Sequence, residues 1–314
     1  MERKFSIPYL YWNINNFCNK IEEQKESIQE IRLQNHFLSG LSQKECKEKE
    51  NLNDKIIECA NDNNIEVALM ADNIFLHDNN INEINTIKKY INQHNIDTIY
   101  CSDINIAHAA KDSNNNINIV ISNAFIEQNE RSLSMWDSMF RLYKVNINPD
   151  YARNIIKIKE IYELGYDIII PINDQCLTFC NNRIKTLIYG KCSNMYNNCS
   201  NGIVQNMLKY NWLIPKWLTH YDNMNPLYYI SSLSANIDYP FDTVKIYSKN
   251  DDVALRNVVK PFGAIPEERM DISTALLPDE LMTCNFNDCE TVCHKCSNFI
   301  CDHIGLVRYV KNDT

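Results

Sequence analysis

Short apolar segments recur along the chain with helix-like stretches between them, and this alternation constrains the fold more than any other feature. One helix-like stretch carries isoleucines at helical spacing between positions 81 and 91. Another covers residues 148–165, with Asn148 as the expected N-cap and Gly165 as the expected C-terminal cap. Seven segments have the composition of strands: Ser27–Gln34, Ile65–Asn73, Ile96–Asp103, Asn116–Asn123, Phe140–Asn148, Tyr166–Asp174 and Asp242–Lys249.

The spacing of these segments predicts the fold class. Strands that alternate with helices about every 25 residues indicate parallel β–α units. Seven candidate strands favour an α/β fold of the (β/α)8 TIM-like barrel type, although a doubly wound sheet would give the same local pattern. We therefore predict a barrel domain at residues 1–257. Residues 258–314 are irregular and rich in cysteine, and we expect a C-terminal extension packed on or beside the barrel.

Polar residues stand at the end of nearly every predicted strand. In barrels and in open α/β sheets, the functional face lies at the C-terminal ends of the strands. Polar residues also mark the places where loops begin, so each position has this simpler interpretation as well. The residues are Asp72, Asn73, Ser102, Asp103, Ser122, Asn123, Asn146, Asn148, Asn173 and Asp174, followed by Cys176.

Charge and hydropathy narrow the range of partners. The chain has 314 residues and a formal net charge of -9 at pH 7, which disfavours an extended nucleic-acid-binding face. The first residues contain no apolar core of a signal peptide. No stretch reaches the roughly 18 apolar residues of a membrane helix. We expect a cytoplasmic protein that does not enter a membrane.

Thirteen cysteines are the most unusual part of the composition. In a reducing compartment, clustered cysteines indicate metal binding or catalysis more often than disulfides. Cys176 and Cys180 have C-x3-C spacing directly after a predicted strand, and Cys192 and Cys199 follow. Four thiolates can hold an iron–sulfur cluster, whereas zinc sites prefer two closely spaced pairs. Either metal centre is compatible with this group.

A second cysteine group lies in the tail. Cys289, Cys293 and Cys296 form C-x3-C-x2-C, with Cys284 before them and Cys301 after them. Thiols this close together are costly as free thiolates, so we expect a bound metal, either a second iron–sulfur cluster or zinc. The same spacing occurs in radical S-adenosylmethionine enzymes. There the motif follows the first barrel strand and carries an aromatic residue at the position of Lys295, so this interpretation is disfavoured.

The segment NDQCLTFCNNR (Asn173–Arg183) is the most specific motif of the chain. It is similar to N-E-x-C-x-x-x-C-x-x-R of the collagenase-like peptidase family U32, which the chain resembles over most of its length. NWLIPKWLTHY (Asn211–Tyr221) and TVKIYSK (Thr243–Lys249) are similar to further family segments. In TVKIYSK the family's Gly is lost and its Arg is replaced by Lys249, which weakens a planar clamp for carboxylate or phosphate. FSIPYLYWNINNF, IEVALMADN and NPDYARN complete the resemblance.

The resemblance implies a barrel with an oxygen-sensitive 4Fe-4S cluster near the C-terminal face. Cys176 and Cys180 are its best ligands, Cys192 is a plausible third, and Cys199 or a tail cysteine is the fourth. Family members are associated with oxygen-independent hydroxylation of RNA bases or of a quinone precursor, sometimes as heterodimers.

Three functional hypotheses follow. The first is an iron–sulfur enzyme that carries out a hydroxylation-type redox modification of a small molecule, a peptide or an RNA base, in some cases with a protein partner. Its expected catalytic residues are Asn173 and Asp174, with Lys245 as an anion anchor at the barrel mouth. The second is a peptidase or other hydrolase, for which Cys176 with a distant base such as His220 is one candidate pair. The third is a scaffold with zinc bound by Cys284, Cys289, Cys293 and Cys296.

Overall fold

The structure is a computed structural model, and it describes most of the first 251 residues. The described ranges are 2–34, 43–71, 80–94, 96–123, 128–152, 154–177, 210–213, 215–230 and 237–251.

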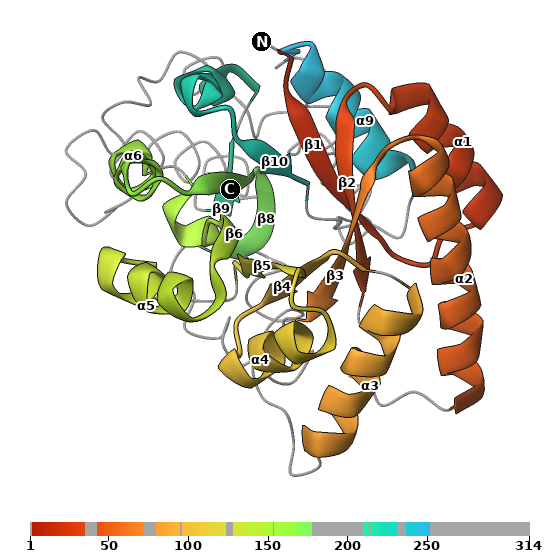
Figure 1. The fold of residues 1–314 in the computed structure, drawn as a ribbon. Helices are drawn as coiled ribbons and strands as arrows, with labels where there is room; N and C mark the ends of the chain where they lie inside the picture. The colour runs from red at the N-terminus through yellow and green to blue at the C-terminus, as the bar shows by residue number, and fades with distance from the viewer. Residues whose placement is uncertain are drawn as a thin grey trace, which may run out of the picture. The chain divides into compact units, whose positions relative to one another are not determined.

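Strands in the described part of the chain form a closed barrel (Figure 1). The hydrogen-bonded order is β1-β10-β7-β6-β5-β4-β3-β2, and the pairs that run from β1 through β2 to β7 are all parallel. This order confirms the predicted (β/α)8 TIM-like fold. The barrel strands are β1 (Lys4–Tyr9), β2 (Ile28–Gln34), β3 (Glu66–Ala71), β4 (Thr98–Cys101), β5 (Asn118–Ile121), β6 (Leu142–Asn146), β7 (Asp167–Pro171) and β10 (Leu227–Tyr229).

Helices follow most of the barrel strands along the chain and pack on the outside of the sheet. They are α1 (Ile14–Gln24), α2 (Gln43–Asp62), α3 (Asn80–His94), α4 (Ile104–Ser113), α5 (Glu130–Phe140), α6 (Ile155–Glu163) and α9 (Asp238–Ser248). Buried apolar residues recur on one side of each helix, as Phe17 and Ile21 do on α1 and Leu133, Trp136 and Phe140 do on α5. This spacing directs an apolar stripe at the sheet.

The remaining elements are short. β8 (Asn173–Leu177) and β9 (Tyr210–Trp212) form a separate antiparallel pair. The 3-10 turns are η2 (Pro149–Tyr151), η5 (Pro215–His220) and η6 (Asp222–Met224).

Six of the seven predicted strands are present in the barrel, and one prediction was wrong. The segment 242–249 is not a strand but lies almost entirely in helix α9. Asp242, Lys245 and Ser248 are exposed while the residues between them are mostly buried, which is a helical period. The Val–Lys–Ile alternation at 244–246 resembled a strand only over its short length. Strands β1 and β10 were not among the seven.

The start of helix α6 also differs from the prediction. Asn148 does not cap it, because a 3-10 turn at Pro149–Tyr151 intervenes. Asn154 has the capping role instead, since its side-chain oxygen accepts from the backbone N–H of Lys157 at 3.0 Å. Gly165 ends the helical stretch as predicted, with a φ of 94° that favours glycine.

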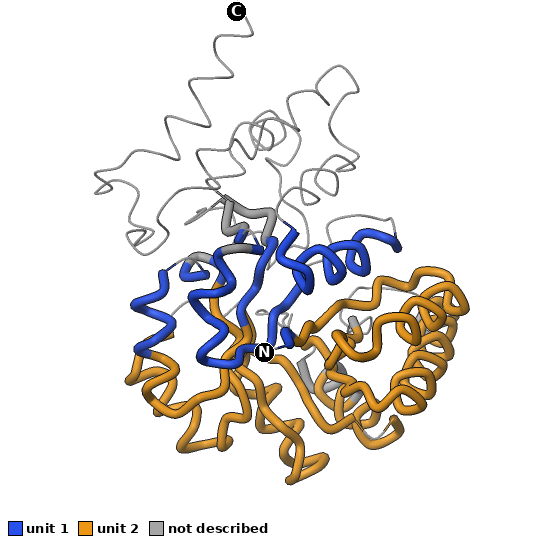
Figure 2. The backbone as a smooth tube through the Cα atoms, turned by 90° about the horizontal axis from the view of Figure 1, so that it is seen from above, with its two compact units in different colours: residues 1–3, 149–160, 170–314 blue, residues 4–148, 161–169 orange. Residues whose placement is uncertain are grey.

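The chain divides into two compact units (Figure 2). Residues 4–148 and 161–169 form one unit, which holds β1 to β6 and helices α1 to α5. Residues 1–3, 149–160 and 170–314 form the other, which holds β8, β9, β10 and α9. The predicted boundary at residue 257 lies outside the described residues, as does the predicted extension 258–314.

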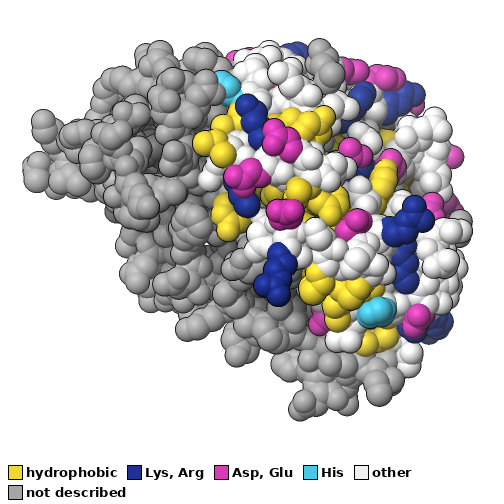
Figure 3. Space-filling view, turned by 60° about the vertical axis from the view of Figure 1, so that its left-hand side comes forward, with side chains coloured by type: hydrophobic (Ala, Val, Ile, Leu, Met, Phe, Trp, Pro, Cys, Tyr) yellow, Lys and Arg dark blue, Asp and Glu magenta, His cyan; other side chains and the backbone are white. Residues whose placement is uncertain are grey.

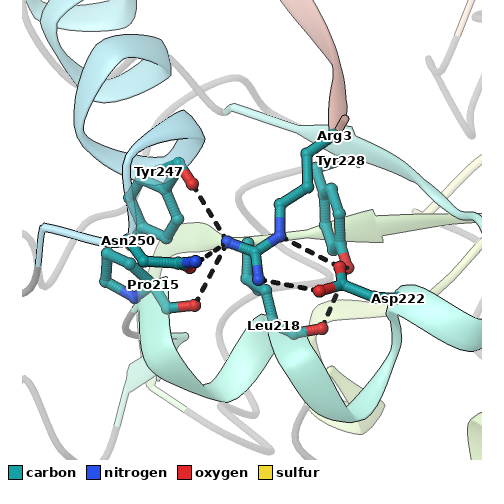
Figure 4. Close-up of polar contacts among 7 residues, drawn as sticks. All are labelled: Arg3, Pro215, Leu218, Asp222, Tyr228, Tyr247 and Asn250. Carbon is teal, nitrogen blue, oxygen red and sulfur yellow. Dashed lines mark hydrogen bonds and ion pairs between the residues drawn. The ribbon is translucent and has the colours of Figure 1, made fainter. Parts of the chain in front are cut away.

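Within the unit that contains residues 1–3, a buried arginine binds several segments of the chain (Figure 4). The guanidinium of Arg3 binds both oxygens of Asp222, each at 2.9 Å, in a bidentate pair. Its third nitrogen donates to the carbonyl oxygen of Tyr247 at 3.0 Å and to the Asn250 side chain. Tyr228 donates to the same aspartate at 3.0 Å. Arg3 therefore joins the turn at η6 to the end of helix α9.

The surface drawn in Figure 3 mixes acidic, basic and apolar side chains on its described part. This mixture differs from the continuous basic track that an extended nucleic-acid site needs. No helix in the described ranges is both long enough and apolar enough to cross a membrane. The large hydrophobic side chains that are exposed in the described part are Met135, Met139, Ile156, Tyr162 and Leu164.

Candidate functional site in the barrel interior

A buried charged cluster occupies one level of the barrel interior. Glu30 and Arg32 lie two residues apart on β2, and both side chains are almost completely buried. The Nε of Arg32 donates to Glu30 Oε1 at 2.9 Å and to the Ser6 hydroxyl at 2.7 Å. Ser6 donates to the same carboxylate at 2.5 Å, and Tyr100 donates to its two oxygens at 2.7 and 2.9 Å. The guanidinium also lies over the Tyr100 ring, 4.0 Å from its centroid.

The alternation of strand side chains places this cluster inside the barrel. On β1, Tyr9 packs against Phe17 of α1 with ring centroids 4.9 Å apart, so the odd-numbered positions of β1 face the helices. Ser6 is therefore on the opposite face, toward the barrel axis. Its hydrogen-bond partners on β2 and β4 share that face. We call Ser6, Glu30, Arg32 and Tyr100 the charged layer.

A second ion pair crosses the same interior. Lys144 on β6 is buried, and its Nζ lies 3.6 Å from Glu66 Oε2 on β3. The Lys144 ammonium is also 4.4 Å from the centroid of the neighbouring Tyr143 ring. Lys144 thus has an opposite charge nearby, which limits the cost of burying its ammonium. The Glu66 side chain itself is 42% exposed, and the Lys144 Nζ makes no hydrogen bond within the described residues.

Three of the predicted strand-end residues form a row beside the charged layer. Cys101 of β4 pairs with Ile121 of β5, and Ile121 pairs with Val145 of β6. One residue further along, Ser102 and Ser122 directly follow β4 and β5, and Asn146 is the last residue of β6, so the three stand at the same level. The ladder continues to this level, because the Ser122 N–H donates to the Cys101 carbonyl at 3.0 Å.

These three residues face the barrel axis. They lie two positions beyond Tyr100, Val120 and Lys144, which occupy the interior face, and the side-chain period of a strand is two. We call Ser102, Ser122 and Asn146 the polar row. It stands at the C-terminal ends of the strands, where barrels carry their sites.

The polar row is buried but incompletely hydrogen-bonded. Asn146 and Ser122 are fully buried, and so is the Oγ of Ser102. Within the described residues, neither Oδ1 nor Nδ2 of Asn146 has a hydrogen-bond partner, and neither does the Ser102 hydroxyl. The hydroxyl of Ser122 contacts Asn123 Oδ1 at 3.5 Å. Folded proteins leave few buried polar groups in this state.

The backbone beneath Asn146 is held firmly. Buried Gln128 donates from Nε2 to the Asn146 carbonyl at 2.8 Å. Its Oε1 accepts from the Asn148 N–H at 2.7 Å. The amide of Gln128 thus substitutes for a neighbouring strand where β6 ends.

Asp103 has the simpler role that the sequence left open, whereas the catalytic role predicted for Asn173 stays a prediction. Asp103 caps helix α4, because its side chain accepts from the Asn105 N–H at 2.7 Å. Asn173, a predicted catalytic residue, is buried and donates from Nδ2 to the Tyr239 hydroxyl at 2.8 Å. Complete burial raises the pKa of Tyr239. Asn173 thereby joins the start of β8 to helix α9.

Lys245 does not end a strand. It lies in the last turn of α9 and its side chain is exposed. The segment 242–249 that carries it was predicted as a strand and is almost entirely helix. Its role as an anion anchor stays a prediction.

The predicted metal ligands fall at the edge of the described part or beyond it. Cys176 belongs to β8, which follows barrel strand β7 after one residue. Asp174, predicted as a catalytic residue, lies on the same strand, and its role stays a prediction. Cys180, Cys192, Cys199, Cys284, Cys289, Cys293 and Cys296 lie outside the described residues, as does Cys301. Among the described residues, no group of three or more His, Cys, Asp or Glu could hold a metal ion.

The charged layer was not predicted from the sequence, although a signal was present. In the segment IQEIRLQ, Glu30 and Arg32 alternate with Ile31 and Leu33. Both faces of a parallel barrel strand are covered, so charges at every second position indicate a charged interior rather than a solvent face.

A family model matches one part of the chain. Residues 43–180 match peptidase family U32. The resemblance to family U32 is confirmed over this region. The U32 region begins with helix α2 and contains β3 to β8, the polar row, Cys176 and Cys180.

Comparisons with curated proteins and with solved structures add no information about activity. No curated protein matches the chain. The solved structures with similar folds include an endo-β-1,4-mannanase from Thermotoga petrophila, at 10% identity and TM-score 0.38, covering 80% of this chain and 78% of that one. Another is an N-acetylneuraminate lyase from Fusobacterium nucleatum, at 11% identity and TM-score 0.40, covering 89% and 98%. At these scores neither supports any argument about activity.

Proposed function

We propose that the chain is an iron–sulfur enzyme of the U32 type that carries out an oxygen-independent, hydroxylation-type modification in its barrel. One observation carries the proposal: the U32 match extends through the C-x3-C pair, Cys176 and Cys180. The substrate is a small molecule, a peptide or an RNA base.

The donor set fits an iron–sulfur cluster. Cys176, Cys180, Cys192 and Cys199 would supply four thiolates, the usual ligands of a 4Fe-4S cluster. The tail group, Cys284, Cys289, Cys293 and Cys296, would hold a second cluster or zinc. A bound cluster would supply one-electron transfer. β8, which carries Cys176, begins two residues after the end of barrel strand β7.

Residues of the chain position this cysteine strand. The Ile172 N–H donates to the Tyr229 carbonyl of β10 at 3.0 Å, and the Ile172 carbonyl accepts from Leu213 at 2.9 Å. Asn173 binds Tyr239 of α9. These bonds fix the residues just before Cys176, so Asn173 is a positioning residue. In the barrel, the polar row would bind and orient the substrate, and the charged layer would hold the strands that carry it.

The experiment compares iron in anaerobically purified variants. We expect Cys176→Ala and Cys180→Ala each to lose the barrel cluster's iron and sulfide. Cys59→Ala is the matched control, because Cys59 is a half-buried free thiol on α2 and should leave the iron unchanged. Equal iron in all three variants and in the wild type would contradict the proposed ligands.

The family's name keeps a peptidase as the second candidate. A hydrolase with Cys176 as nucleophile would lose peptide cleavage in Cys176→Ala without a change in metal content. Cys293→Ala tests the tail separately: loss of zinc alone would assign that group to a zinc site, and loss of iron would assign it to a second cluster.

A further inference from the structure

We infer that the polar row, Ser102, Ser122 and Asn146, is a subsite for a neutral ligand group that presents a hydrogen-bond donor beside an acceptor, as a primary amide or a lactam does. The inference rests on the proposed function in treating the barrel interior as the place where the substrate binds. It adds the chemical class of the group that binds there.

The first argument is the missing hydrogen bonds of the Asn146 side chain. Asn146 is fully buried, and within the described part of the chain neither its Oδ1 nor its Nδ2 has a hydrogen-bond partner. Burying an amide without hydrogen bonds is unfavourable, so an apolar residue would make a more stable barrel here. A carboxamide offers one acceptor and one donor side by side, which pairs best with a ligand carrying the complementary set. The Ser102 hydroxyl, also buried without a partner in the described residues, adds a third bond.

The second argument is charge. The polar row itself carries no ionisable side chain. Its charged neighbours in the interior lie in opposite-sign pairs, Glu30 with Arg32 and Lys144 with Glu66, so that their charges cancel, although the Lys144 Nζ makes no hydrogen bond within the described residues. The Glu30 carboxylate also accepts bonds from the hydroxyls of Ser6 and Tyr100. A charged ligand would have to be desolvated at this row without a countercharge in it, so a neutral ligand is favoured.

The third argument is rigidity. Gln128 fixes the backbone on both sides of position 147 through its bonds to the Asn146 carbonyl and the Asn148 N–H. The side chain of Asn146 is thus carried on a held backbone while its own polar atoms remain available. Groups held in this way bind with less loss of conformational freedom.

A stability measurement tests whether Asn146 has a structural role. Asn146→Leu replaces the amide with an apolar group of similar size. We expect the midpoint of thermal unfolding without ligand to rise by about 2–4 °C, which corresponds to roughly 1 kcal/mol in a domain of this size. The control is Asn53→Leu on α2, a fully buried amide whose Nδ2, unlike that of Asn146, donates a hydrogen bond, to the Tyr90 hydroxyl at 2.8 Å. That variant should unfold at a lower temperature. A lower midpoint for Asn146→Leu as well would overturn the inference.

A binding measurement tests the ligand class. Ligand-observed NMR would compare 2-pyrrolidinone, a lactam, with cyclopentanone, which has the same ring size but no N–H, and with acetate, an anion. We expect 2-pyrrolidinone to bind the wild type at least about tenfold more tightly than the other two, as one lost hydrogen bond implies. We expect Asn146→Leu to abolish that preference. Equal binding of the three probes, or an unchanged preference in Asn146→Leu, would overturn the inference.

The binding test does not depend on the cluster. If the lactam preference is found in protein without iron, the subsite is supported while the proposed redox function fails. If iron is present and the preference is absent, the function stands and the subsite is overturned.

Discussion

The charged layer and the polar row lie on neighbouring levels of the same barrel interior, yet their hydrogen bonding differs. Around Glu30, donors from β1, β2 and β4 converge on one carboxylate at 2.5–2.9 Å. Around Asn146, the described residues provide no bond to the side chain at all. Satisfied polar networks stabilise and specify a fold, whereas unsatisfied ones are unfavourable unless something else binds them. The difference indicates that the Glu30 carboxylate is structural and that the Asn146 side chain is kept for binding.

Removing the charge at the centre of the charged layer should have the largest effect. In Glu30→Gln, the Arg32 guanidinium stays buried without its anionic partner. We expect the free energy of unfolding to fall by about 3–5 kcal/mol. Urea denaturation of the variant and the wild type would measure it. A double variant, Glu30→Met with Arg32→Met, should recover most of the loss, because an apolar pair leaves no buried charge. A decrease of less than 1 kcal/mol in the free energy of unfolding of Glu30→Gln would contradict a structural role for this layer.

Some of this organisation could be predicted from the sequence. The alternation of strands and helices predicted the barrel, because the apolar residues of buried strands and of amphipathic helices recur with different periods. The β10 strand, Leu227–Tyr229, was missed because three residues are too short to show a period. The segment 242–249 was misassigned for the converse reason: over eight residues, a helix with a wide buried face can imitate strand alternation.

The candidate site was predicted only in part. Ser102, Ser122 and Asn146 were marked as strand ends, but the same reasoning also marked Asp103, which only caps a helix. Polar composition cannot separate these roles, because the difference lies in whether a residue faces the barrel axis or the next helix. That Glu30 and Arg32 pair with each other, and bind Tyr100 some 70 residues away, depends on tertiary structure.

Tyr100→Phe would weaken the charged layer without removing a charge. It deletes the hydroxyl that donates to both Glu30 oxygens but keeps the ring beneath the guanidinium. We expect the free energy of unfolding to fall by about 1.5–3 kcal/mol, which is the usual contribution of hydrogen bonds to a charged group. The control is Tyr162→Phe, which alters an exposed tyrosine and should change stability very little. Equal stability of the two variants would show that the Tyr100 hydroxyl is not needed.

The Arg3 pair allows a comparison with a less buried site. The Asp222 side chain is 28% exposed, whereas Glu30 is 1% exposed. In Arg3→Met, water can therefore replace part of the hydrogen bonding that Asp222 loses. We expect the free energy of unfolding to fall by about 1–2 kcal/mol, less than for Glu30→Gln. Denaturation under the same conditions checks this order. A larger loss for Arg3→Met would mean that burial does not set the strength of these pairs.

Ser102→Ala should give the smallest effect and the opposite sign. The substitution removes a buried hydroxyl that has no partner among the described residues. We expect the free energy of unfolding to rise by up to about 1 kcal/mol. The substitution breaks no hydrogen bond and removes the cost of burying the hydroxyl away from water. Differential scanning calorimetry of ligand-free protein would resolve this change. A clear loss of stability would place Ser102 with the charged layer and not with the polar row.

The metal content of anaerobically purified wild-type protein tests the central claim most directly. Iron, acid-labile sulfide and zinc should be quantified in the same sample. The proposed function predicts about four irons per chain for one cluster, or about eight for two, with matching sulfide. Zinc alone, with no iron even after anaerobic reconstitution, would contradict it and leave a scaffold or a hydrolase as the better description of the protein.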